Sequence, residues 1–241
     1  MRLPVLRGII DRRILVNYRI SPDVLRPLLP PPFEPRTIHG SAMGGICLIR
    51  FRELRPRNVP AALGLSSENA AHRFAVEWSD GGVRRQGVYV HRRDTSSHLS
   101  AAMGGRLFPG QQHHATFEAR DDRTTSEVAL RSDDGVTRVA VAGTVHDRLP
   151  PDSIFESLGE ASRFFEEGSH GYSPRRGSAP LDGMELRTAQ WSVFPLAVKR
   201  AESSVFDDPA VFPPGSVAFD CALVMRDIAH EWHALRALTA L

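Results

Sequence analysis

The chain is almost free of lysine: of its 30 lysine and arginine residues, only Lys199 is a lysine. Arginine stays protonated and does not act as an amine nucleophile, so Lys199 is the one side chain able to form a Schiff base. Leu196 and Val198 form the apolar row of its segment, which places Lys199 in the opposite row. We therefore expect Lys199 to face solvent, and we expect no Schiff-base chemistry.

Cysteine is nearly as scarce, since the chain has only Cys47 and Cys221, each inside an apolar strand-like run. So sparse a pair is neither a disulfide framework nor a metal-binding motif. Each thiol is expected to behave as a small buried hydrophobe. No charged-then-apolar leader opens the chain, and no apolar run approaches the ~18 residues of a membrane span. These features predict a cytoplasmic protein without a membrane partner.

Concentrated charge is absent as well, because basic and acidic residues are interleaved and the formal net charge is +2. A nucleic-acid surface would show a basic stripe, so we expect no DNA or RNA partner. The Gly44-Gly45 and Gly104-Gly105 pairs lack the strand–turn–helix context of a phosphate-binding loop, and no cofactor is expected. A homo-oligomer is left open.

Ten histidines raise the question of a metal site. His230 and His233 are three residues apart, a spacing that suits one face of a helix. The segment is not the metalloprotease motif H-E-x-x-H, and no third ligand is fixed by spacing. We predict no metal, while leaving open whether His230 and His233 bind one and keeping a histidine-based metal enzyme as a weaker alternative.

Short segments of alternating polarity, separated by turn signals, predict a mostly β protein in one domain over residues 1–241. Hairpins are predicted at Asp80-Gly81-Gly82 and at Asp133-Asp134-Gly135. Three short helices are expected, after Ser21, over 96–103 and over 158–167, the last beginning at a capping box of Ser157 and Glu160. The predicted strands cover 14–20, 42–51, 73–78, 83–93, 111–120, 127–131, 136–145, 185–194, 196–200 and 217–228.

Several motifs occur in a characteristic order. The first part of the chain has a strand from Ile14, Ser21-Pro22-Asp23-Val24-Leu25, Leu28-Leu29-Pro30, and Gly40-x-Ala42 before a Gly44-Gly45 strand. Then come Arg73-x-x-Val76, Gly87-Val88-Tyr89-Val90, Asp94, a helix over Ala101–Leu107 and Phe108-Pro109. In this order they resemble the YqjF-like family of bacterial proteins, which shares the acetoacetate-decarboxylase-like barrel.

The resemblance implies a closed, highly curved antiparallel β-barrel with a few short helices packed outside and a small-molecule cavity within. The decarboxylases of that superfamily use a cavity lysine as a Schiff-base nucleophile. Their lysine comes from a mid-chain strand that corresponds roughly to Gln111–Arg120, where this chain has no lysine. The resemblance therefore implies the decarboxylase fold without its nucleophile.

Three polar side chains, Tyr89, His91 and Arg93, share one face of the predicted strand 83–93. If Val88 and Val90 on the other face pack beneath the helices, the polar row lines the cavity, with Arg73 across the hairpin. The alternative is a ladder of cross-strand pairs on a solvated face, each contributing ~0.2–1 kcal/mol.

Such a wall predicts distinct roles for its members. Arginine forks bind carboxylates, and the predicted ligand-binding residues are Arg73, His72, Tyr89 and Arg93. Histidines move protons, and the predicted catalytic residues are His91 and His114, with Glu68 or Asp94 tuning them.

The sequence thus predicts a barrel that binds a small carbonyl or carboxylate compound, as a general acid–base lyase or isomerase without a Schiff-base lysine. The first alternative is a barrel that binds a small ligand without turnover. A structural protein with a filled core is a weaker one.

Overall fold

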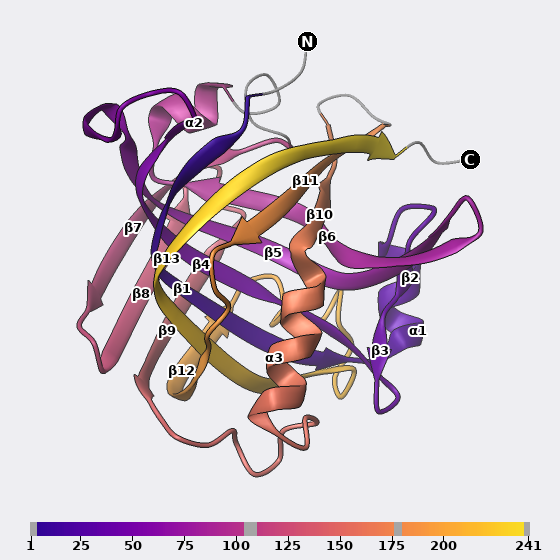
Figure 1. Cartoon of the computed structure of the whole chain (residues 1–241). Coiled ribbons are helices and arrows are strands. Elements are labelled where there is room, and N and C mark those ends of the chain that lie inside the picture. Colours follow the sequence, from indigo (N-terminus) through magenta and orange to yellow (C-terminus); the bar gives the residue numbers. More distant parts are fainter. Residues whose placement is uncertain (1–3, 104–109, 176–179, 239–241) are drawn as a thin grey trace.

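The computed structural model describes residues 4–103, 110–175 and 180–238, and it is mostly β-strand with a few short helices (Figure 1). The predicted fold class is confirmed. Within these ranges the strands are β1 (Leu6–Ile20), β2 (Glu34–Pro35), β3 (Thr37–Ile38), β4 (Ser41–Pro56), β5 (Leu65–Asp80), β6 (Val83–Thr95), β7 (His113–Asp121), β8 (Thr125–Ser132), β9 (Arg138–Val145), β10 (His170–Ser173), β11 (Leu181–Thr188), β12 (Phe194–Ser203) and β13 (Val217–Leu238). The helices are α1 (Pro22–Leu25), α2 (His98–Met103) and α3 (Leu158–Glu166), with short 3-10 turns η1 (Arg26–Leu28), η2 (Ala61–Leu63) and η3 (Glu167–Ser169).

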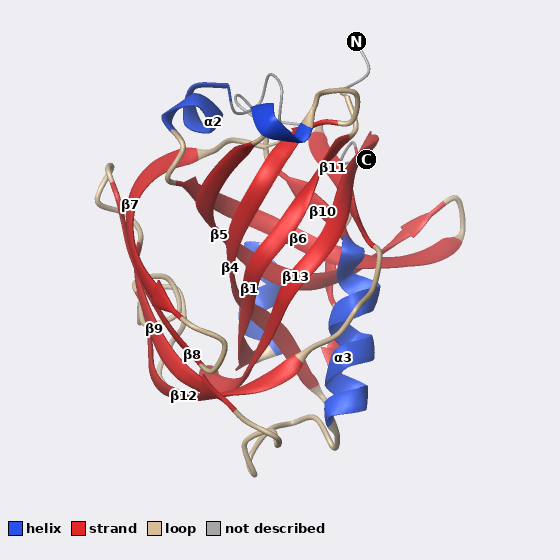
Figure 2. Ribbon diagram, turned by 60° about the vertical axis from the view of Figure 1, so that its left-hand side comes forward, coloured by secondary structure: helices blue, strands red, loops and turns tan. Residues whose placement is uncertain are grey.

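Five long strands form the central sheet in the order β13-β1-β4-β5-β6, each antiparallel to its neighbours. Figure 2 shows β13, β1, β4 and β5 side by side. Both faces of this sheet are covered, so Ile14 to Tyr18 of β1 are all buried. Alternate residues consequently enter two different cores, as Phe74 and Ala71 of β5 do.

The sheet closes on itself because β6 and β13 each change partners along their length. On one edge β13 pairs first with β12 at Leu223 and Val224, and then with β11 from His230 to Leu238. Strand β6 likewise pairs in parallel with β10 at Val88 and with β7 at Asp94. Two walls, β10-β11 and β7-β8-β9-β12, therefore join the edges of the central sheet into closed rings of strands. The β7, β8, β9 and β12 wall curves away from the central strands in Figure 2.

Helix α3 packs on the sheet through Ala161, Phe164 and Phe165, which belong to the same core as Cys47 and Ala71 (Figure 1). The predicted cap is confirmed, since Ser157 Oγ accepts a 3.1 Å hydrogen bond from the Glu160 backbone N–H.

Both predicted hairpins form, at Asp80–Val83 and between β8 and β9. Several predicted boundaries are wrong, since β1 begins at Leu6 rather than at residue 14 and β5 at Leu65 rather than at residue 73. The strand expected over 185–194 is β11, which ends at Thr188, and β13 continues ten residues past Ile228 to Leu238. The Gly104-Gly105 pair, the part of the Ala101–Leu107 motif beyond Met103, and the motif Phe108-Pro109 lie outside the described residues.

Among the described residues, every helix is too short or too polar to cross a membrane.

Candidate functional site

A cavity of about 110 Å³ lies against one face of the central sheet. About 10–15 Å³ of such volume admits one water, so the cavity can hold several waters or a small organic molecule. Its walls are largely apolar and include Leu6, Ile49, Phe51, Leu54, Val88, Val90, Met184, Leu186 and Trp232. The polar and ionisable groups in the wall include Arg13, Arg73, Arg93, Asp94, Cys47, Asn69, Gln112, Ser67, Ser100 and Ser169. A few polar groups in an apolar cavity are typical of a small-molecule site.

The strand register explains which residues meet in this wall. Cys47 of β4 lies opposite Ala71 of β5, and Ala71 lies opposite Arg93 of β6. Residues directly opposite on neighbouring strands point to the same face of a sheet. Arg13 is a diagonal neighbour of Cys47, because Arg13 pairs with Ile49.

A β-bulge in β6 corrects the predicted orientation of this strand. Arg73 pairs with Val90 whereas His72 pairs with Arg92, so His91 is an extra residue. A bulge shifts the alternation by one residue. Val90 on one side of it and Arg93 on the other consequently both line the cavity.

The prediction that Tyr89 and His91 line the cavity is therefore wrong. Tyr89 packs in the other core against Phe33, with ring centroids 5.8 Å apart. His91 stacks on Phe74 at 5.7 Å, and burial lowers its pKa to about 4.

Three arginines of the cavity wall lack a carboxylate partner among the described residues. Arg13 Nε donates to Cys47 Sγ at 3.0 Å, Arg73 Nη2 to Asn17 Oδ1 at 2.7 Å, and Arg93 Nε to Ser173 Oγ at 3.1 Å. The remaining segments, 1–3, 104–109, 176–179 and 239–241, contain no aspartate or glutamate. The cavity therefore concentrates positive charge that acidic side chains leave uncompensated.

Burial makes these charges costly. It lowers the pKa of Arg73 and of Arg93 to about 10. Arg73 Nε and Arg13 Nη1 are buried and find no hydrogen-bond partner in the described part of the chain. Buried polar and charged groups are normally satisfied, and these two donors can be satisfied by an anion in the cavity.

Asp94 lines the cavity but is already paired. Its carboxylate accepts hydrogen bonds from Arg92 at 2.8 Å and 3.1 Å, and it is 1% exposed. Burial raises the pKa of Asp94, while its bonds to Arg92 oppose that rise.

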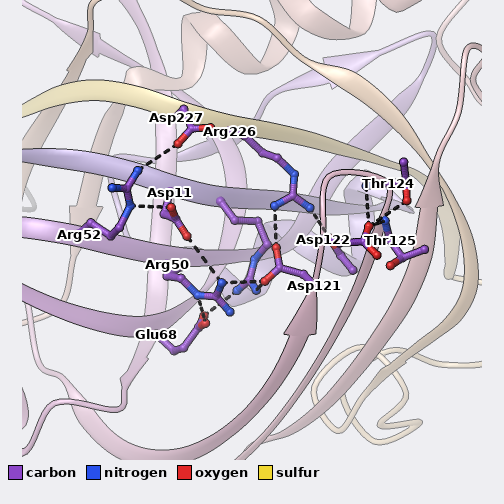
Figure 3. A network of polar contacts seen from close by, with 12 residues as sticks. Asp11, Arg50, Arg52, Glu68, Asp121, Asp122, Thr124, Thr125, Arg226 and Asp227 are labelled. Atoms are coloured by element: carbon purple, nitrogen blue, oxygen red, sulfur yellow. Dashed lines mark hydrogen bonds and ion pairs between the residues drawn. The ribbon is translucent and has the colours of Figure 1, made fainter.

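Glu68, predicted to tune a catalytic histidine, is absent from the cavity wall and belongs to a network of ion pairs (Figure 3). It accepts hydrogen bonds of 2.6 Å from the fully buried Arg12 and from Arg50. Both arginines also contact Asp121, at 3.3 Å and 2.7 Å respectively. The Glu68 carboxylate is therefore paired with two arginines rather than with a histidine.

The other two predicted histidines also lie elsewhere. His72 is fully buried in the other core, where desolvation lowers its pKa to about 3, and neither ring nitrogen has a hydrogen-bond partner among the residues the structure describes. His114 contacts Asp133 at 2.7 Å and stacks on His98 at 3.7 Å. Of the predicted residues, the structure brings together Arg73, Arg93 and Asp94 in the cavity wall and places His72, His91, His114, Tyr89 and Glu68 outside it.

Lys199 is exposed, as predicted, and it is the extra residue of a β-bulge between Val198 and Arg200 in β12. The only lysine of the chain is therefore outside the cavity wall.

The helical spacing considered for His230 and His233 does not apply, because both residues lie in β13. In a strand, residues three apart point to opposite faces. His230 is buried against Phe51, whereas His233 contacts Glu231 at 2.9 Å. Among the described residues, no three His, Cys, Asp or Glu side chains are grouped closely enough to hold a metal ion.

The sequence did not predict a role at the cavity for three residues: Arg13 and Cys47, which line it, and Asn17, which accepts a hydrogen bond from Arg73. The usable signal is that Arg13 and Asn17 share the row of Leu15, which is apolar and buried. A polar residue in a strand's buried row requires a partner or a ligand.

Comparison with known proteins agrees with this architecture. Residues 10–222 match the family model DUF2071, described as "Uncharacterized conserved protein (COG2071)". The chain belongs to the DUF2071 family. No curated protein matches it.

Solved structures similar to this DUF2071 member include the acetoacetate decarboxylase from Legionella pneumophila, with a TM-score of 0.60 and 12% identity over 97% of this chain and 88% of that one. An acetoacetate decarboxylase-like enzyme from Sphingomonas wittichii RW1 gives 0.64 and 13%, covering 99% and 94%. The enduracididine biosynthesis enzyme MppR, complexed with pyruvate, gives 0.64 and 15%, covering 100% and 92%. At these identities the likeness concerns the fold, and it confirms the predicted acetoacetate-decarboxylase-like resemblance.

Proposed function

We propose that the cavity binds a small carboxylate compound, whose carboxylate group contacts Arg73 and Arg13 and whose remainder lies against the apolar walls. The observation that carries this proposal is the absence of a carboxylate partner for Arg13, Arg73 and Arg93 among the described residues. A bound carboxylate supplies the missing negative charge and accepts from the unpartnered Arg73 Nε and Arg13 Nη1. Pyruvate, the molecule complexed with the similar structure MppR, is a ligand of this chemical class.

Binding is favoured over general acid–base turnover because the histidines predicted to move protons are outside the cavity wall. Among the described residues of that wall Asp94 is the one carboxylate, and it is paired with Arg92. A proton transfer from Asp94 would require the ligand to compete with this ion pair.

Calorimetric titration with pyruvate and acetate, each compared with its neutral amide, tests the proposal. We expect the acids to bind and the amides to fail, because only the acids offset the buried charge. Arg73→Met should weaken binding by about 1.5–3 kcal/mol, the usual contribution of a hydrogen bond to a charged group. Arg84→Met is the matched control, since Arg84 is exposed and pairs with Glu77.

The stability of Arg73→Met should stay equal or rise, because an incompletely paired buried cation is removed. Arg93→Met serves as the second variant if Arg73→Met does not fold. Equal affinity for acids and amides, or unchanged affinity in both variants, would refute carboxylate binding.

A further inference from the structure

Cys47 lies in the cavity wall beside the arginines, a setting unlike that of an inert buried thiol. It is 3% exposed, and its sulfur accepts the 3.0 Å hydrogen bond from Arg13 Nε. Arg73 and Arg93 line the same cavity, and Ala71 pairs with Cys47 on one side and with Arg93 on the other. The sulfur therefore shares its cavity wall with three guanidinium groups.

Arg13 connects this sulfur to the position of a ligand. Its Nε contacts Cys47, while its Nη1 is buried without a partner. The two nitrogens belong to one planar guanidinium group, so Arg13 can bind an anion through Nη1 while its Nε keeps the contact with the sulfur. Arg73, which is 4% exposed and whose Nε has no partner among the described residues, lines the same cavity and can donate to the second carboxylate oxygen.

We propose that the ligands are 2-oxo acids and that Cys47 is a nucleophile that adds reversibly to their carbonyl carbon. This inference rests on the carboxylate binding proposed above. In the proposed pose Arg13 and Arg73 hold the carboxylate, and the carbon attached to it faces Cys47, which lines the same cavity. In a 2-oxo acid that carbon is an electrophilic carbonyl.

The addition balances without another reactant. A bond forms between Cys47 Sγ and the carbonyl carbon, and the carbonyl π bond breaks. The proton of the thiol passes to the carbonyl oxygen, which becomes a hydroxyl group, and the product is a hemithioketal. The reverse step restores the free thiol and the 2-oxo acid. Cys47 thus supplies covalent chemistry at a cavity that Lys199 does not line.

Cys221 provides the contrast within the same chain. It is fully buried and lies outside the cavity wall. Burial raises the pKa of Cys221, and the neighbouring Asp220 raises it further. A ligand in the cavity therefore meets Cys47 and not Cys221.

Nuclear magnetic resonance with pyruvate isotopically labelled at its carbonyl carbon tests the addition directly. With the full chain we expect a protein-bound signal in the range of a tetrahedral carbon. Cys47→Ala and Cys47→Ser should bind pyruvate without that signal, and with affinity lowered by roughly tenfold, which corresponds to about 1.4 kcal/mol. Bound pyruvate that remains a ketone in the unsubstituted chain would overturn the role of Cys47 and leave carboxylate binding intact.

Alkylation offers a second measurement that does not require pyruvate. Iodoacetate carries the carboxylate that the arginines are proposed to hold, whereas iodoacetamide does not. We expect the rate ratio of iodoacetate to iodoacetamide at Cys47 to rise at least about tenfold above the ratio in the urea-unfolded chain. Peptide mapping reports Cys221 in parallel, and Cys221 should stay unlabelled in the folded chain. An unchanged ratio together with no pyruvate binding would overturn both proposals.

Discussion

The guanidinium of Arg73 and the amide of Asn17 are joined across Gly45. Asn17 pairs with Gly45 on one side, and Gly45 pairs with Arg73 on the other. The hydrogen bond from Arg73 Nη2 to Asn17 Oδ1 is 2.7 Å long and spans the intervening strand. A Cβ at Gly45 would lie 2.2 Å from the Val16 carbonyl oxygen, so the close approach of these strands requires glycine.

Replacing Asn17 by aspartate should separate stability from ligand binding. The new carboxylate would pair with Arg73 and neutralise it, so the free energy of unfolding should stay equal or rise by about 1 kcal/mol. Affinity for pyruvate should fall at least about tenfold, because the charge that attracts the ligand is compensated internally. Denaturant unfolding and calorimetric titration on the same samples measure the two effects. Retained affinity would show that Arg73 does not hold the ligand, whereas Asn17→Ala should merely destabilise the fold.

Arg12 is expected to be a principal electrostatic support of the fold. It is fully buried and contacts Glu68 at 2.6 Å and Asp121 at 3.3 Å. Removing one partner of a buried ion pair typically costs about 3–5 kcal/mol, and Arg50, which contacts both carboxylates, should reduce that figure for Arg12→Met. In Arg200→Met the lost pair with Glu202 is exposed, and the change should stay below about 1 kcal/mol. Similar unfolding midpoints for both variants would contradict this assignment.

Stability should fall on acidification partly because of His72. Desolvation lowers its folded-state pKa from 6.5 to about 3. Above pH 6.5 the ring is neutral in both states and its stabilising effect is complete. Below that pH the unfolded chain takes up a proton that the folded chain does not, and stability falls by roughly 1.4 kcal/mol per pH unit until the folded pKa is reached.

His72→Phe should therefore flatten the pH dependence of unfolding between pH 6 and about pH 4, measured by denaturant titration at each pH. His114→Phe is the comparison, because His114 lies outside that core and contacts Asp133. Parallel curves for the unsubstituted chain and His72→Phe would show that His72 titrates normally in the folded state.

Lys199 should take no part in ligand chemistry. Borohydride reduction in the presence of pyruvate should add no mass to the peptide that contains Lys199, because this side chain is exposed and outside the cavity wall. Lys199→Arg should bind pyruvate as the unsubstituted chain does. A reduced adduct at Lys199 would reinstate a Schiff-base mechanism.

Much of the fold follows from the sequence because hairpin turns and alternation are local signals. The turn at Gly81-Gly82 and the cap at Ser157 need no tertiary information. The orientation of Tyr89 and His91 was mispredicted because a single extra residue in β6 exchanges the two faces of the strand. That bulge depends on pairing with β5, which alternation within one strand does not contain.

The candidate site was harder to predict because its members come from strands distant in the sequence. Arg12 and Arg13 are adjacent and identical in type, yet one enters the ion-pair network and the other contacts Cys47. Arg73 and Arg93 could be anticipated because they lie on one predicted hairpin. Cys47 looked like a hydrophobe because its polar contact comes from another strand.

Because β5 is buried on both faces, its alternate residues contribute to two separate parts of the interior. Ala71 and Arg73 line the cavity, whereas His72 and Phe74 pack in the core on the opposite face of the sheet. A substitution at Ala71 would change the shape of the cavity without changing the packing of the opposite core. Substitutions at alternate positions of β5 can therefore alter the shape and charge of the cavity while the residues that pack the opposite core stay the same.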